Sequence, residues 1–118
     1  MKESIIREKS FSFALQIIKL FKLLQDNKEY VISKQLLRSG TSIGANIMEA
    51  AAAQSKKDFL SKMSIASKEA RETKYWLSLL NESELVNISF GNHLDEINHI
   101  INILTRIVKT TSEDIKSK

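Results

Sequence analysis

The stretch Leu36 to Ala53, LLRSGTSIGANIMEAAAA, constrains the fold more than any other part of the chain. Apolar residues recur in it at intervals of three or four, which predicts one helix with a single packed face. Most other positions carry Gly, Ala, Ser or Thr, so a neighbouring helix can approach this backbone closely. Gly40 and Gly44 each cost about 1 kcal/mol relative to alanine inside a helix. A close packing contact at a tight helix crossing, or a hinge, would offset that loss. The alternative is that the glycines leave a backbone face open to a ligand.

The composition predicts one domain, residues 1–118, with 42% hydrophobic residues available for a single core. The chain has no cysteine, which excludes disulfides, thiolate metal sites and thiol catalysis and fits a reducing compartment. No stretch approaches the ~20 apolar residues that cross a bilayer, and the charged N-terminus lacks the pattern of a secretion signal. We therefore expect a cytoplasmic protein that does not bind membranes.

Polar breaks divide the chain into four predicted helices, at about 10–25, 29–53, 56–80 and 90–110, followed by a tail that is expected to fray. Ser55, with Asp58 three residues later, is the expected cap of the third helix, and Ser89 is the expected cap of the fourth. The third and fourth helices carry heptad-like apolar stripes, which are typical of antiparallel packing. The sequence therefore predicts an all-α, antiparallel up-down-up-down four-helix bundle with short loops.

The net charge of +4 is distributed unevenly along the chain. Residues 1–80 carry 14 basic and 8 acidic side chains, whereas residues 81–118 carry 4 basic and 6 acidic ones. Attraction for a polyanion is therefore expected in the first part. Tyr75 lies beside this charge and could stack on a base. The candidate nucleic-acid contacts are basic residues of the second and third helices, whose alternative role is a solvated surface: Lys34, Arg38, Lys56, Lys57, Lys68, Arg71 and Lys74.

Two helices have more apolar surface than one intramolecular contact requires. The third helix has an acidic flank that includes a tryptophan, and the fourth extends its apolar arc on one side. Surplus apolar surface indicates self-association, although a tryptophan beside an apolar stripe is also common in cores. The predicted oligomer interface consists of Ile65, Glu69, Glu72, Trp76, Ile100, Ile103 and Ile107.

The segment LLRSGTSIGANIMEA, followed by SKKDFLSKMSIASKEARETKYWLSLL, resembles a known bacterial family. It is similar to the four-helix-bundle proteins encoded in intervening sequences of 23S ribosomal RNA genes, and to related accessory proteins of diversity-generating retroelements. The likeness extends from about Phe13 to Val108 and is strongest across Leu36 to Leu80. It implies a ring, typically a homopentamer, with a basic surface for nucleic acid. In the retroelement branch it also implies a reverse transcriptase partner, and it implies no enzymatic activity or cofactor.

Three interpretations follow from these patterns. The first is a non-enzymatic oligomer that binds RNA, DNA or a hybrid, and the second is a scaffold that recruits a protein such as a reverse transcriptase. The third is a metal–carboxylate enzyme, which requires Glu49, Glu69 and Glu72 to converge on a metal. That interpretation is disfavoured because di-iron bundles need a Glu-x-x-His pair, which the sequence lacks. His93 and His99 lie about 120° apart on a helix and are expected to be surface or capping residues.

Overall fold

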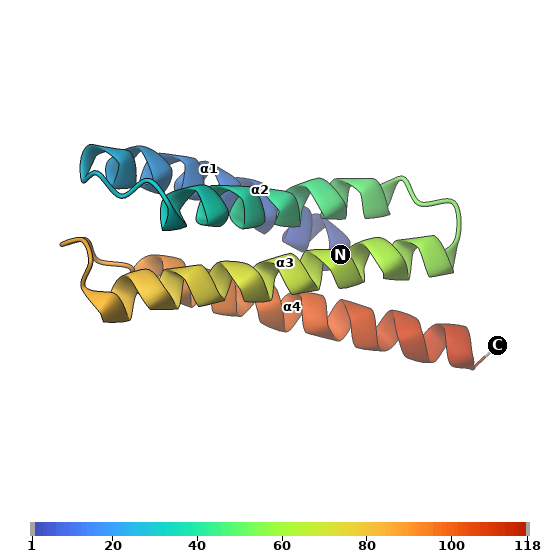
Figure 1. Ribbon diagram of the computed structural model, residues 1–118. Coiled ribbons are helices and arrows are strands. Elements are labelled where there is room, and N and C mark those ends of the chain that lie inside the picture. Colours follow the sequence, from blue (N-terminus) through green and yellow to red (C-terminus); the bar gives the residue numbers. More distant parts are fainter. Residues whose placement is uncertain (1, 118) are drawn as a thin grey trace.

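The computed structural model describes residues 2–117, and these residues form four α-helices and no strand. The helices are α1 (Lys2–Asp26), α2 (Ile32–Ala51), α3 (Lys56–Ser83) and α4 (Gly91–Lys116). Each helix packs against its neighbours in the sequence, and α1 also contacts α4. Helices α1 and α2 form one layer and α3 and α4 a second (Figure 1), in a body measuring 52 × 22 × 22 Å. Within residues 2–117, none of the helices is long and apolar enough to cross a membrane.

The two terminal helices are longer than the sequence predicted. Helix α1 begins at Lys2 rather than near Ser10, because Ile6 continues its buried stripe and is fully enclosed by the core. Helix α4 continues to Lys116, so the expectation that the tail frays after residue 110 was wrong. Helix α2 is shorter than predicted at both ends.

The helix starts use different caps. Ser55 Oγ accepts a hydrogen bond of 3.0 Å from the backbone N–H of Asp58, which confirms the predicted cap of α3. The prediction for α4 was wrong, since the residue at its cap position is Phe90 and no side-chain cap is made. Before α2, the buried Glu29 carboxylate accepts hydrogen bonds from three backbone N–H groups, those of Val31, Ile32 and Ser33.

Close packing against α1 accounts for the small residues of α2. A Cβ atom built on Gly40 would lie 3.0 Å from Cγ2 of Ile17, which is tighter than ordinary van der Waals contact. A Cβ atom on Gly44 would lie 3.4 Å from Ser10 Oγ. The structure therefore favours the tight crossing, in which Gly40 allows Ile17 to fill the seam between the helices.

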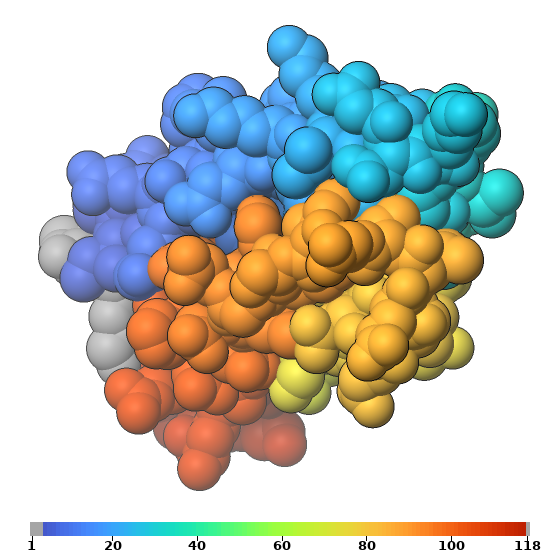
Figure 2. Space-filling view, turned by 90° about the vertical axis from the view of Figure 1, so that its left-hand side faces the viewer, coloured from blue at the N-terminus to red at the C-terminus, as the bar shows by residue number. Residues whose placement is uncertain are grey.

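Polar contacts join the middle and later part of α2 to the first part and middle of α3. Thr73 Oγ1 donates a 3.0 Å hydrogen bond to Ser39 Oγ in the interior. Two ion pairs flank this contact, Arg38–Glu72 at 3.0 Å and Lys62–Glu49 at 3.2 Å. Later residues of α2 thus meet earlier residues of α3, and all four helices contribute residues to the apolar core. Figure 2 shows the α1–α2 layer above the α3–α4 layer.

Candidate nucleic-acid interface

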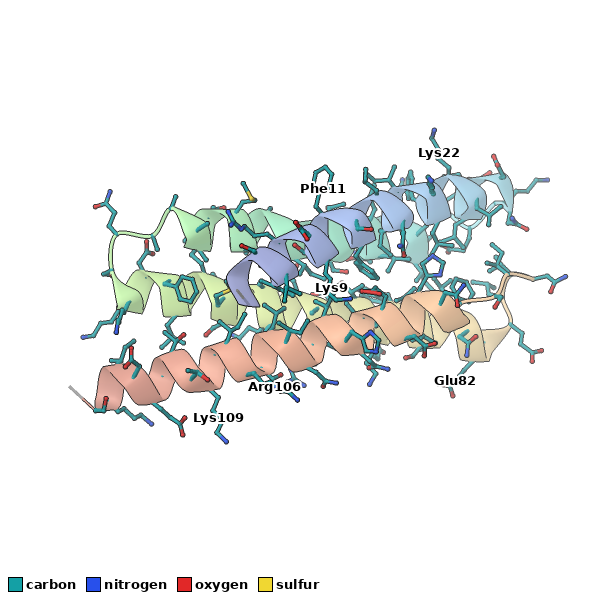
Figure 3. All side chains as sticks on the ribbon, turned by 180° about the vertical axis from the view of Figure 1, so that it is seen from behind. Lys9, Phe11, Lys22, Glu82, Arg106 and Lys109 are labelled. Atoms are coloured by element: carbon teal, nitrogen blue, oxygen red, sulfur yellow. The ribbon has the colours of Figure 1, made fainter. Side chains whose placement is uncertain are left out.

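Exposed cations from two helices gather on the outer side of the α3–α4 layer. We call this surface the basic face and define it by Lys68, Arg71 and Lys74 of α3 and Arg106 and Lys109 of α4, all of which are exposed. Arg71 Nη2 donates a hydrogen bond of 3.2 Å to Thr105 Oγ1, so its guanidinium group reaches across to α4. Arg106 and Lys109 project from α4 away from the bundle (Figure 3). The basic face therefore spans both helices.

A shallow groove of about 460 Å³ follows the seam between these helices. Hydroxyl groups lie beside the cations in it, and Glu113 and Lys116 lie at one end. The stretch 97–112 of α4 contains Arg106 and Lys109 but no Asp or Glu. The expectation that polyanion attraction is confined to residues 1–80 therefore needs correction, because the acidic residues of the last segment lie on either side of this stretch.

Two of the seven predicted cations lie in the other layer, and two lie at the start of α3. Lys34 and Arg38 belong to α2 in the other layer, and Arg38 is paired with Glu72. Lys56 forms an ion pair with Asp114, while its neighbour Lys57 is exposed at the start of α3. The structure therefore brings together Lys68, Arg71 and Lys74 and places Lys34 and Arg38 in the other layer, whereas Lys56 and Lys57 lie on α3 eleven or more residues before Lys68.

The residues predicted for an oligomer interface lie on two helices, and those of α3 differ in exposure. Ile65 is exposed, whereas Glu69, Glu72 and Trp76 are half-buried along the side of α3 that meets α2. Glu72 Oε2 accepts a 3.1 Å hydrogen bond from Trp76 Nε1 in addition to its ion pair with Arg38. This flank therefore combines a partly accessible indole with carboxylates.

The isoleucines of α4 require a correction. Ile100 is 0% exposed and Ile107 is 5% exposed within one chain, and Ile103 is partly buried against the same core. Their flank faces α1, which meets α4 through the 3.0 Å Lys9–Glu96 ion pair among other contacts. The wide apolar arc of α4 arises because this helix packs against both α1 and α3, so Ile100 and Ile107 have almost no surface left for a second chain.

The carboxylates and histidines show no convergence on one centre. Glu49 pairs with Lys62 and Glu72 with Arg38, and among the described residues no group of three His, Cys, Asp or Glu side chains could hold a metal ion. One oxygen of Glu69, Oε1, is buried without a hydrogen-bond partner. Burial lowers the pKa of His93 below its ordinary value, and His99 is exposed. Carboxylates that pair with Lys and Arg disfavour the metal–carboxylate interpretation.

Sequence reasoning missed the contribution of α4 to the basic face, and it assigned no exposed apolar residue of α1 or α2 to a site. Phe11 and Met48 are 68% and 61% exposed, and Leu15 and Ile18 are also exposed. The signal was available in the first helix, whose apolar arc is wider than one packed face requires.

The helices and their packing define the described chain as an all-α, four-helix protein. It belongs to the 23S rRNA-intervening sequence protein family, whose model matches residues 2–106. The chain is similar to a crystal structure of a Bacteroides thetaiotaomicron protein of unknown function from the S23 ribosomal protein family, with 47% identity and a TM-score of 0.87. That likeness covers 92% of this chain and 99% of the other. No curated protein matches the sequence.

Proposed function

We propose that this protein is a non-enzymatic homo-oligomer that binds RNA through the phosphodiester backbone on its basic face. The observation that carries the proposal is the convergence of cations from α3 and α4 on one groove, with Arg71 held by Thr105 at 3.2 Å. The names of the family and of the similar structure refer to an intervening sequence of 23S rRNA and to a ribosomal protein family, and neither states a ligand, so RNA is tested beside DNA and a hybrid.

The chemistry of the face suits phosphate better than base edges. Lys and Arg side chains beside Ser and Thr hydroxyl groups provide charged and neutral donors for phosphate oxygens. Such contacts fix where a strand lies but carry little sequence information. An oligomer would present several copies of the face, so a modest affinity per chain would be multiplied.

The topology of the protomer and the number of subunits belong to the same proposal. The order of the α2–α3 contacts, together with the α3–α4 pairs Arg71–Thr105 and Lys56–Asp114, supports an up-down-up-down protomer. The ring of five subunits and the reverse transcriptase partner, which the family resemblance implies, stay predictions.

The experiment is a titration of fluorescent single-stranded RNA, DNA and an RNA–DNA hybrid with the purified oligomer at low salt. The variant Arg71→Glu with Lys109→Glu should weaken RNA binding by at least about 100-fold, because it replaces two attractive contacts by two repulsive ones. The matched control is Lys19→Glu with Lys34→Glu, which makes the same charge change in the other layer and should weaken binding much less.

Equal losses in the two variants would indicate non-specific attraction to net charge and would remove the basic face from the proposal. An intact oligomer that binds none of the three nucleic acids at low salt would overturn the function and favour the protein scaffold. Each variant is checked for helical content and assembly mass before binding is measured, so that unfolding is not mistaken for lost binding.

A further inference from the structure

A pocket of about 480 Å³ lies at the end of the bundle that carries the α2–α3 connection. The last turns of α2, the connection and the first turns of α3 line it, together with Arg7 of α1. In Figure 1 the start of α1 lies well short of this connection, whereas α2 and α3 extend to it. The volume falls within the range of roughly 300–1,000 Å³ that is typical of small-molecule sites. The pocket is therefore large enough to hold a small molecule.

The inner wall of the pocket is apolar and belongs to the core. Ile47, Ala50 and Met63 line it and are at most 1% exposed. Phe59 lines the same wall and packs against the core, and Ala51 lines the pocket from the exposed end of α2. Because these side chains offer no hydrogen bond, the part of a ligand that meets them must be hydrocarbon.

The charged residues that line the pocket are both basic. They are Arg7 and Lys56, and Lys56 forms an ion pair with Asp114 of α4. Arg7 is exposed, and its Nη2 atom donates a hydrogen bond of 3.5 Å to Ser4 Oγ. Arg7 forms no ion pair with another described residue. The guanidinium group of Arg7 is therefore the cation of this pocket that an anion can pair with.

We propose that this pocket binds a small carboxylate with an aliphatic body. The carboxylate pairs with Arg7, which can form two parallel hydrogen bonds with it, and the hydrocarbon lies against Ile47, Phe59 and Met63. A neutral molecule would leave Arg7 without a partner, and a fully polar anion would leave the apolar wall in water. One cation matches the single charge of a carboxylate better than a phosphate monoester, which carries nearly two charges at neutral pH.

Two methionines report which pocket is occupied. Met63 lines the proposed site, whereas Met48, which is 61% exposed, lines a separate groove between α1 and α2 that also includes Arg7. The first experiment adds octanoate, below its micelle concentration, to protein with isotope-labelled methionine methyl groups and follows their NMR signals. The Met63 signal should shift and saturate while the Met48 signal stays in place. A saturable shift of Met48 alone, or of neither methionine, would overturn the proposal.

A variant that fills the pocket tests whether the hydrocarbon lies inside it. Ala51→Phe places a ring in the pocket from an exposed helix end, so the fold should be kept. Octanoate binding should weaken at least about tenfold, as when two methylene groups are no longer buried. The matched control is Ala52→Phe, since Ala52 is exposed, does not line the pocket, and should tolerate the ring without loss of binding. Unchanged affinity in a folded Ala51→Phe protein would contradict the site.

The role of Arg7 is tested by comparing octanoate with octanol, which has the same hydrocarbon and no charge. The wild type should bind octanoate at least about tenfold more tightly, as for a hydrogen bond between charged groups. Arg7→Gln should remove this preference. Lys22→Gln removes a charge from the same helix at an exposed position away from the pocket and should keep it (Figure 3). Equal affinity of the wild type for the two compounds, or equal loss in the two variants, would overturn the pairing with Arg7.

Chain length tests the apolar wall. From hexanoate to decanoate, each added methylene group should tighten binding about threefold until the pocket is filled. An affinity that does not depend on chain length would overturn the proposed wall contact. The inference does not depend on RNA binding: a protein that binds octanoate in this pocket but no RNA would lose the proposed function and keep this site.

Discussion

The outer surfaces of the two layers differ in chemistry although the same fold produces both. The α1–α2 layer exposes Phe11 and Met48 around a channel of small residues. The α3–α4 layer exposes Arg71, Arg106 and Lys109 beside hydroxyl groups. Each helix needs one apolar stripe for the core, so its outward stripe is free to carry other residues. Apolar burial and phosphate contact respond differently to salt, and this difference gives the comparison a direct test.

Raising the salt concentration should therefore affect the two surfaces unequally. With about four phosphates contacted per chain, an increase from about 50 to about 200 mM lowers affinity for single-stranded RNA roughly 50-fold. Association through buried apolar side chains should change much less in the same range. RNA titrations and assembly mass, recorded in identical buffers, check this expectation. Parallel loss of binding and assembly would mean that the two surfaces do not act separately.

The second helix of each layer also starts differently. The Glu29 carboxylate accepts three backbone hydrogen bonds at the start of α2, whereas α4 begins at Gly91 without a side-chain cap. Glu29→Ala should lower the free energy of unfolding by about 2 kcal/mol, because it leaves helix N–H groups without acceptors. Urea unfolding measures the change. Ser89→Ala, two residues before α4, is the control and should be neutral; a comparable loss there would contradict the difference in capping.

The packing of α1 against α2 predicts different outcomes for the two glycines. Gly40→Ala should destabilise the protein by about 1 kcal/mol, because overpacking against the stiff, buried Ile17 exceeds the gain in helix propensity. Gly44→Ala should stabilise it by about 0.5 kcal/mol, since its Cβ would meet Ser10 at ordinary contact distances of 3.4 to 3.7 Å. Thermal and urea unfolding of both variants check this pair. Equal stabilisation would indicate that Ile17 shifts easily and that Gly40 is not required for packing.

Most of the fold could be predicted from the sequence because apolar spacing is a local property. The four helices and the Ser55 cap follow from residues close together in the chain. The start of α1 could not be predicted in this way. Lys2 to Lys9 is rich in charge, and the segment is helical because Ile6 reaches a core built by other helices. Tertiary packing there outweighs the local pattern.

The candidate site was less predictable because it depends on which helices are neighbours. The side of α3 that carries Lys68 and Arg71 was visible in a helical projection, but its junction with Arg106 and Lys109 was not. Because residues 81–118 carry more acidic than basic side chains, a charge count over this segment does not reveal these two cations. In the same way, a helical projection cannot distinguish an apolar flank covered by α1, such as Ile100 and Ile107, from one left open to solvent.

The smallest expected effect concerns His93, which lies where the two layers meet. It lines a pocket with Gln16, Lys19 and Leu23 of α1, and its Nδ1 atom is buried without a hydrogen-bond partner. Burial lowers the pKa of His93 below 6.5, so the unfolded chain binds this proton more readily than the folded chain does. The stability that neutral His93 contributes is therefore complete above its pKa in the unfolded chain. It is lost as the pH falls toward its pKa in the folded chain. Urea unfolding across this range should show a shallower decline for His93→Gln than for the wild type, and an equal decline in both would contradict this role of His93.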